Sequence, residues 1–216
     1  LPIAGATLGD GIKWWDGPAA GTGWVNFIPP LSGSTSAVPP RYLRGALMIL
    51  TYKDCVLVLN TWESDGDGLA RNFFNRARWS QNGTPFFTEN NDTPPALPPE
   101  YLIPTGFNAE QNAWFDTTVG KGGFIDAPTN EAIISAEFIK DTLIVYFERS
   151  TWQLVYTANE TLPFVWQRIN AELGSESTFS TVGFDRGNFS IGNYGIITCD
   201  SVNVQRIDQK IPDEVF

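Results

Sequence analysis

Histidine is absent from this chain of 216 residues, and cysteine occurs only twice. Without histidine the chain cannot form a Ser-His-Asp triad, a Cys-His dyad or a metal site with an imidazole ligand. Two cysteines, Cys55 and Cys199, are too few for a tetrahedral thiolate zinc site. Each lies in an apolar, strand-like run, where an unpaired cysteine behaves as a small buried hydrophobic residue. We therefore expect reduced core thiols in place of a disulfide.

Basic residues are scarce as well: 14 Lys and Arg stand against 24 Asp and Glu, a formal net charge of −10. Such a charge repels the phosphates of nucleic acids and anionic lipid surfaces. No apolar run reaches the ~18 residues that a membrane-spanning helix needs. We expect neither nucleic-acid binding nor a membrane span.

An internal repeat is the main positive feature of the sequence. YKDCVLVLN (52–60) and IKDTLIVYF (139–147) align at an offset of 87 residues, and each carries a Lys-Asp pair, at 53–54 and at 140–141. Four apolar positions follow each pair. Lys-Asp is expected to form the turn between two strands in both copies, because Asp favours tight turns.

Further matches extend the repeat. At the same offset Trp79 falls on Trp166, and a looser third copy (183–207) has Asp185-Arg186-Gly187 as its turn. The repeat unit is then a β-meander of roughly 40 to 50 residues, the length of a propeller blade, and the offset would span about two blades.

These patterns predict an all-β fold of propeller-like blades, each an antiparallel β-meander, with long Pro-rich loop excursions. Residues 1–41 form an irregular segment rich in aromatic residues, Gly and Pro, and 42–216 form the propeller-like body with a long insertion at about 84–130. Six prolines within 84–106 exclude a central strand there. NAWFDT (112–117) is a possible short strand, and WQRINAELG (166–174) is the one helix candidate, which competes with a strand in FVWQRI.

The run TLIVYFERSTWQLVY (142–156) is apolar on both faces of its first strand, because residues two apart share a face. Such a strand is sandwiched between neighbouring sheets. Glu148-Arg149-Ser150 is then the turn that reverses the chain, in preference to a functional ion pair. With only about three blades in the chain, sheet faces stay uncovered, and we expect their burial by a partner to matter most at Thr142–Phe147.

The order of these segments resembles tail-hub proteins of short-tailed bacteriophages, including tail-tube or nozzle and tail stabilisation proteins with β-propeller bodies. The resemblance covers residues 42–83 and 131–212 and is carried by RYLRGALMILTYKDCVLVLNT, FFNRARWSQNGTP, DTLIVYFERSTWQLVYT, FVWQRI and IGNYGIITCDSVNVQRI. It implies a non-enzymatic virion protein, made in the host cytoplasm and located in the phage tail. Its implied partners are other tail or portal-proximal proteins and further copies around the tail axis, with DNA only as passing cargo.

The resemblance has a limit in length, because 216 residues cannot supply a full propeller at this blade size. The chain is thus either a segment of such a protein or a related small β protein. A carbohydrate-binding β module for host-surface recognition is the alternative, since the chain has eight tryptophans. Trp79, Trp152 and Trp166 lie within repeat strands, however, where blade packing explains them better.

Paired carboxylates near aromatic residues are the remaining enzyme pattern, since glycosidases use two Asp or Glu residues. The candidates are Glu63, Asp65 and Asp67 near Trp62, and Asp16 beside Trp14 and Trp15. A solvated acidic loop explains them better, because acidic residues are common in turns. DGDG (65–68) is similar to a calcium loop, but the twelfth position from Asp65 is Arg76, where the pattern needs a bidentate Glu. We expect no catalytic residue, cofactor or metal ion.

Overall fold

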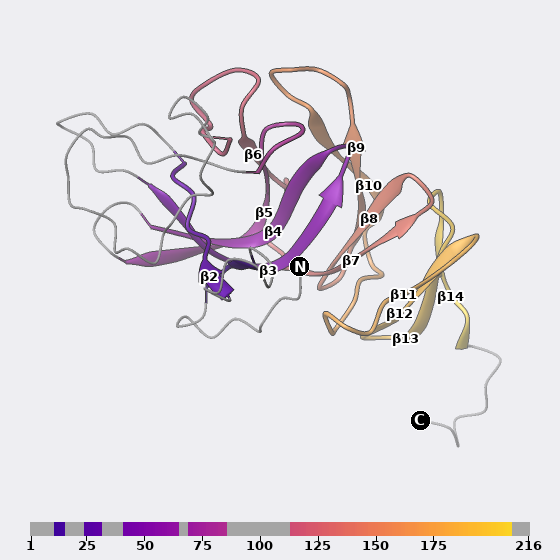
Figure 1. Ribbon diagram of the computed structural model, residues 1–216. Coiled ribbons are helices and arrows are strands. Elements are labelled where there is room, and N and C mark those ends of the chain that lie inside the picture. The colour runs from indigo at the N-terminus through magenta and orange to yellow at the C-terminus, as the bar shows by residue number, and fades with distance from the viewer. Residues whose placement is uncertain (1–10, 16–23, 32–40, 65–68, 86–112, 209–216) are drawn as a thin grey trace, which may run out of the picture. The chain divides into compact units, whose positions relative to one another are not determined.

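The computed structural model describes residues 11–15, 24–31, 41–64, 69–85 and 113–208 (Figure 1). Within them the fold is all-β, as predicted: twelve antiparallel strands form three four-stranded sheets, and two further strands form a separate ribbon. This described part shows no closed propeller and contains no helix long and apolar enough to cross a membrane. The chain divides into two compact units, Leu1–Ile125 and Asp126–Phe216.

The first unit contains a sheet whose strands follow one another in sequence order, drawn in purple to pink in Figure 1. Its strands are β3 (Tyr42–Tyr52), β4 (Cys55–Ser64), β5 (Ala70–Trp79) and β6 (Gly123–Asp126), and β1 (Lys13–Trp15) pairs with β2 (Trp24–Asn26). Lys53 and Asp54 form the turn between β3 and β4 with φ angles of 51° and 61°. Positive φ at both central residues gives a twist that matches the flanking strands, so this turn fixes the register of the hairpin.

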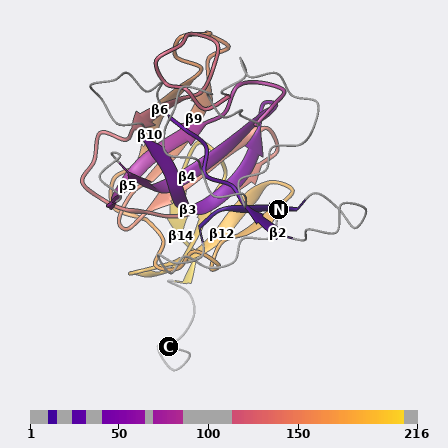
Figure 2. The same ribbon diagram turned by 60° about the vertical axis from the view of Figure 1, so that its left-hand side comes forward.

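A hydrophobic core covers one face of this sheet within the first unit. Its buried residues are Ile12, Phe27, Leu31, Leu43, Ala46, Val58, Ala113 and Trp114. Trp114 is fully buried, packs edge-on against Phe27 at 6.1 Å between ring centroids, and donates its indole N–H to the carbonyl oxygen of Pro85 at 2.7 Å. Ala113 and Trp114 lie in a turn, so the possible strand at 112–117 is wrong for these residues. The segment that follows β2 is joined to the start of β3 by two backbone hydrogen bonds, from the N–H of Leu31 to the carbonyl of Arg41 and from the N–H of Leu43 to the carbonyl of Pro29 (Figure 2).

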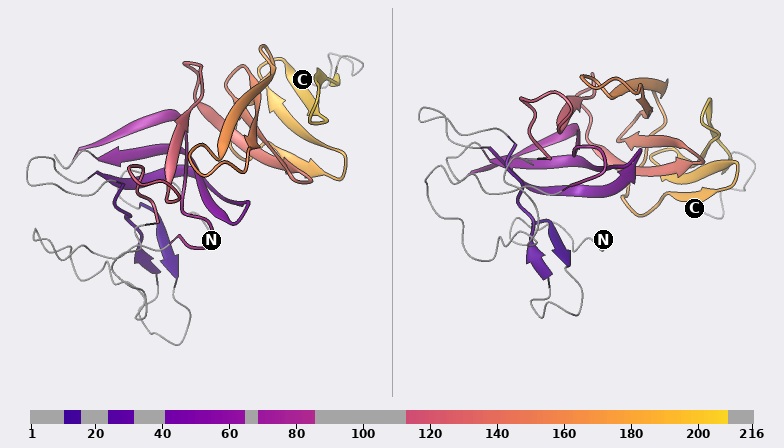
Figure 3. Two further views of the ribbon diagram at one scale, coloured as in Figure 1. Left: turned by 90° about the horizontal axis from the view of Figure 1, so that it is seen from above. Right: turned by 45° about the horizontal axis from the view of Figure 1, so that its top comes forward.

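The second unit consists of two four-stranded meanders, orange and yellow in Figure 3. The first contains β7 (Ile133–Ile139), β8 (Thr142–Phe147), β9 (Thr151–Tyr156) and β10 (Phe164–Asn170). The second contains β11 (Val182–Phe184), β12 (Gly187–Gly192), β13 (Gly195–Cys199) and β14 (Val204–Arg206). The two sheets share a core made of Ile139, Ile144, Tyr146, Ile197, Cys199 and Val204.

Strand β8 has the two-faced burial that its sequence predicts. All five residues from Leu143 to Phe147 have a relative exposure of 0%. Glu148-Arg149-Ser150 forms the reversal into β9, also as predicted, with Glu148 and Arg149 exposed. The helix candidate at 166–174 is wrong, since Phe164–Asn170 is strand β10 and residues 171–174 form a bend and irregular structure.

The hairpins of the predicted repeat are confirmed, but the prediction that its offset spans about two blades is wrong. Lys53-Asp54, Lys140-Asp141 and Asp185-Arg186 each join the first and second strands of a sheet. The offset of 87 residues therefore spans one sheet, because β6 is added only after a long connection from β5. The match of Trp79 with Trp166 is not structural, since Trp79 ends a third strand and Trp166 lies in a fourth.

Candidate assembly surface and buried ion network

Glu63 is the only described member of the carboxylate set that the sequence singled out, and it lies on strand β4 and not in a loop. Asn60 has a positive φ of 54°, and the pairing of β4 with β5 is irregular beside it. Leu59 pairs with Ala77 and Thr61 with Phe73, so β5 carries two more residues than β4 at this point and bulges there. Glu63 lies two residues beyond Thr61 in β4, and its side chain is 2% exposed.

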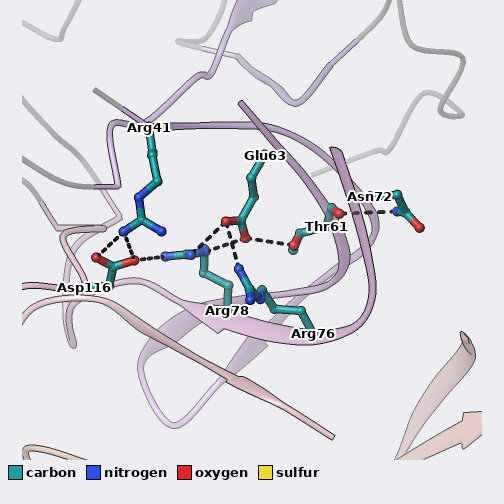
Figure 4. A network of polar contacts seen from close by, with 7 residues as sticks. All are labelled: Arg41, Thr61, Glu63, Asn72, Arg76, Arg78 and Asp116. Atoms are coloured by element: carbon teal, nitrogen blue, oxygen red, sulfur yellow. Dashed lines mark hydrogen bonds and ion pairs between the residues drawn. The ribbon is translucent and has the colours of Figure 1, made fainter. Parts of the chain in front are cut away.

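An ion network surrounds this carboxylate (Figure 4). Glu63 accepts two hydrogen bonds from the guanidinium of Arg78, at 2.9 and 3.0 Å, one from Arg76 at 3.0 Å and one from the hydroxyl of Thr61 at 2.9 Å. Arg78 is 0% exposed and also donates to Asp116 at 3.2 Å. The buried carboxylate thus receives four hydrogen bonds, three of them from guanidinium groups, and such pairing is what burial of a charge requires.

Two further features complete the network. Arg41 donates to both carboxylate oxygens of Asp116 at 2.8 Å, which ties the start of β3 to the connection before β6. The guanidinium of Arg76 lies between the rings of Phe73 and Phe124, 3.9 and 4.0 Å from their centroids. Such stacking stabilises a cation that has left bulk water.

The surroundings of Glu63 do not suit a glycosidase acid or base. A glycosidase acid or base must face the substrate, whereas both oxygens of Glu63 are occupied by buried arginines. Arg76, the residue that breaks the calcium pattern, is one of those partners. Asp16, Asp65 and Asp67 lie outside the described residues, as does DGDG. The described part of the chain contains no cluster of His, Cys, Asp or Glu that could hold a metal ion.

Sequence reasoning missed Arg41, Arg78 and Asp116. A signal for one pair was present, because Arg76 and Arg78 are two apart in a strand-like run and so share a face. Two cations on one face of an apolar strand indicate a buried acidic partner or exposure to solvent. Nothing local distinguishes these outcomes, since Asp116 is 38 positions from Arg78.

Both cysteines are buried and unpaired, as predicted. Burial raises the pKa of the Cys55 thiol to about 11, and the neighbouring Asp54 adds to the shift. Burial also raises the pKa of Cys199. Neutral thiols in apolar surroundings react slowly, so neither residue is a candidate nucleophile or ligand.

The second sheet of the second unit has an apolar face that stays exposed. Cross-strand pairing and the two-residue period assign this outer face to Val182, Phe184, Phe189, Ile191, Ile196, Thr198 and Gln205. Val182, Phe184 and Ile191 are 54%, 58% and 54% exposed. The rings of Phe184 and Phe189 meet edge-on at 4.9 Å. No member of the outer face carries a charge.

The opposite face of the same sheet is buried. Ile197, Cys199 and Val204 pack towards β8, and the side chain of Asn188 donates to the backbone carbonyl of Glu137 on β7 at 3.2 Å. The inner face of this sheet is therefore covered by a second sheet, and the outer face is not. The expectation that a partner is needed most at Thr142–Phe147 is corrected by this arrangement, because that strand is already buried and the uncovered apolar surface lies on β11 to β13.

Comparison with known protein-family models gives no match, and comparison with curated protein sequences gives none either.

Proposed function

We propose that the chain is a non-enzymatic structural component of a bacteriophage virion, located in the tail hub or nozzle and present in several copies around the DNA channel. The observation that carries this proposal is the uncharged apolar outer face of the β11–β14 sheet. A blade-like sheet that buries one face on its neighbour and leaves the other exposed is suited to stacking against further protein. The resemblance to tail-hub segments supplies the biological setting.

The charge of the chain is compatible with this role. A wall that lines a DNA channel must let the phosphate backbone pass without holding it, and a net charge of −10 repels phosphate. The buried ion network contributes rigidity to the first unit, because it joins β4, β5 and the segments before β3 and β6 through charge-assisted hydrogen bonds.

Three of the tryptophans give the carbohydrate-binding alternative no support, whereas Trp24 is 47% exposed. Trp79, Trp114 and Trp152 are 4%, 0% and 6% exposed, so their rings cannot stack on a sugar. A glycan array probed with the purified chain separates the two functions. We expect no specific sugar binding, and a reproducible, competable glycan signal would favour the alternative.

The direct test is to locate the chain in the particle. Virions of a phage that encodes it would be labelled with gold-conjugated antibodies raised against the purified chain and viewed by negative-stain electron microscopy. We expect gold at the tail, and none on tailless capsids from the same lysate. Intact virions that carry no chain by mass spectrometry, or gold confined to the capsid shell, would refute the proposal.

A further inference from the structure

The outer face is unusual for a strand surface in an acidic protein. Its seven residues include five apolar side chains, and its polar members, Thr198 and Gln205, are uncharged. Solvent-facing strands normally carry charged residues, which prevent association. A contiguous face without them on a chain with a net charge of −10 indicates a protein contact.

We propose that this outer face pairs with the same face of a second copy of the chain, related to the first by a two-fold axis. The inner face of the same sheet already shows the type of packing, since it lies against the neighbouring four-stranded sheet through Ile197, Cys199 and Val204. Face-to-face packing of two such sheets needs only complementary apolar surfaces with strand directions within ~30°.

The outer face is complementary to itself. Its bulky end, at the β11–β12 turn, carries Phe184 beside Phe189, and its aliphatic end, at the β12–β13 turn, carries Ile191 opposite Ile196. A two-fold axis in the plane of the contact and perpendicular to the strands places the aromatic end of one copy on the aliphatic end of the other. Each copy then uses the same patch, which is the isologous contact of common homodimers.

The area of the face sets the strength of this contact. The exposed parts of its apolar side chains offer on the order of 300 to 400 Å² per copy, which is the size of the largest patches on monomers. Two such patches fall below the ~1,200 Å² of total buried area that stable complexes reach. The expected dimer is therefore weak and reversible, with a Kd of roughly 10 to 100 μM.

Salt dependence identifies the kind of partner. Two copies repel one another through their net charge of −10 each, while the contact itself is apolar. Raising the ionic strength screens this repulsion, so the dimer becomes tighter with added NaCl. A basic partner on the same face would show the opposite trend.

Sedimentation equilibrium of the full chain between 1 and 200 μM, at 0.05 and 0.5 M NaCl, tests the proposal. We expect a monomer–dimer equilibrium that Phe184→Glu and Ile191→Lys each weaken at least tenfold. Leu162→Glu is the matched control, because Leu162 is 44% exposed in the same unit but lies in the β9–β10 connection. Circular dichroism confirms that each variant is folded. A wild-type chain that stays monomeric at 200 μM, or a dimer that Phe184→Glu and Ile191→Lys leave unchanged, overturns the proposal.

A mixing experiment tests the two-fold geometry. In the proposed contact Phe184 of one copy faces Ile191 of the other. Glu at position 184 in one chain therefore meets Lys at position 191 in its partner. We expect a 1:1 mixture of the Phe184→Glu and Ile191→Lys chains to form heterodimers at concentrations where each variant alone is monomeric. A mixture that remains monomeric contradicts this arrangement.

The proposal stands on the outer face itself and can fail separately from the proposed function. A monomer in solution whose antibodies still label phage tails removes the dimer and leaves the tail assignment. If the chain forms a salt-strengthened dimer in solution but is absent from virions, the dimer stands and the tail assignment is removed. Pairs related by a two-fold axis are also compatible with a ring assembled from dimers.

Discussion

Replacement of Glu63 by Gln is the sharpest test of the buried network. The substitution preserves the shape of the side chain and removes its charge. Arg76 and Arg78, 7% and 0% exposed at their side chains, then keep their charges without the central carboxylate. The network loses one negative charge, and the bidentate pair with Arg78 is lost.

The expected cost follows from this geometry. Removal of one partner of a buried ion pair destabilises a protein by about 3 to 5 kcal/mol, because the remaining charge stays buried. With an m-value of about 2 kcal/mol/M in urea, the midpoint of unfolding falls by roughly 1.5 to 2.5 M. Total stabilities of domains are about 5 to 15 kcal/mol, so the first unit would remain only marginally folded.

Urea titration followed by tryptophan fluorescence and far-ultraviolet circular dichroism measures the change. Asp54→Asn is the matched control: it removes an exposed carboxylate from a turn in the same sheet, and Asn tolerates the positive φ there. The control should unfold within ~0.3 M of the wild type. A Glu63→Gln midpoint that is equally close would refute the view that the charge of Glu63 compensates buried arginines in a low-dielectric site.

A double substitution refines the test. Arg78→Met combined with Glu63→Gln removes both members of the bidentate pair, and Met fills the space of the arginine stem without a charge. We expect the double variant to be more stable than Glu63→Gln alone, with a favourable coupling of at least ~1 kcal/mol. Additive losses would show that Glu63 and Arg78 do not act as a pair.

The remaining predictions concern the core and one tight backbone contact. Val145→Asp places an unpaired carboxylate at a fully buried position in a central strand, so we expect no soluble folded protein on expression. Cys55 and Cys199 should react with a thiol reagent at pH 8 only after denaturation, because both are buried. In the folded chain the rate of reaction at Cys55 should keep rising towards pH 11, since burial raises the pKa of its thiol to about 11. Two thiols that become detectable only after addition of reductant would contradict this prediction. Gly174→Ala would force a methyl group against the backbone carbonyl oxygen of Phe147 at the end of β8, and should lower the free energy of unfolding by more than ~2 kcal/mol. Gly45→Ala, whose methyl group would meet its nearest atom at 3.9 Å, should change it by less than ~1 kcal/mol.

The sequence by itself determined the local β structure. The Lys-Asp pairs at 53–54 and 140–141 predicted hairpins correctly, because turn residues and the two-residue period of a strand are local properties. The burial of both faces of β8 followed from its uninterrupted apolar run in the same way. The meander order of the sheets was also predictable, since consecutive antiparallel strands joined by short turns pair with one another.

Tertiary structure alone decided which polar and apolar residues were covered. Glu63 belongs to an acidic stretch typical of a loop, yet it is buried because Arg76 and Arg78 of the next strand surround its carboxylate, and Asp116 joins from a distant segment. Phe184 belongs to a strand whose pattern is compatible with burial, yet it is exposed because no described part of the chain covers that face. In both cases the side chain's environment depends on neighbours that come from elsewhere in the sequence, and hydrophobic periodicity carries no information about which neighbours those are.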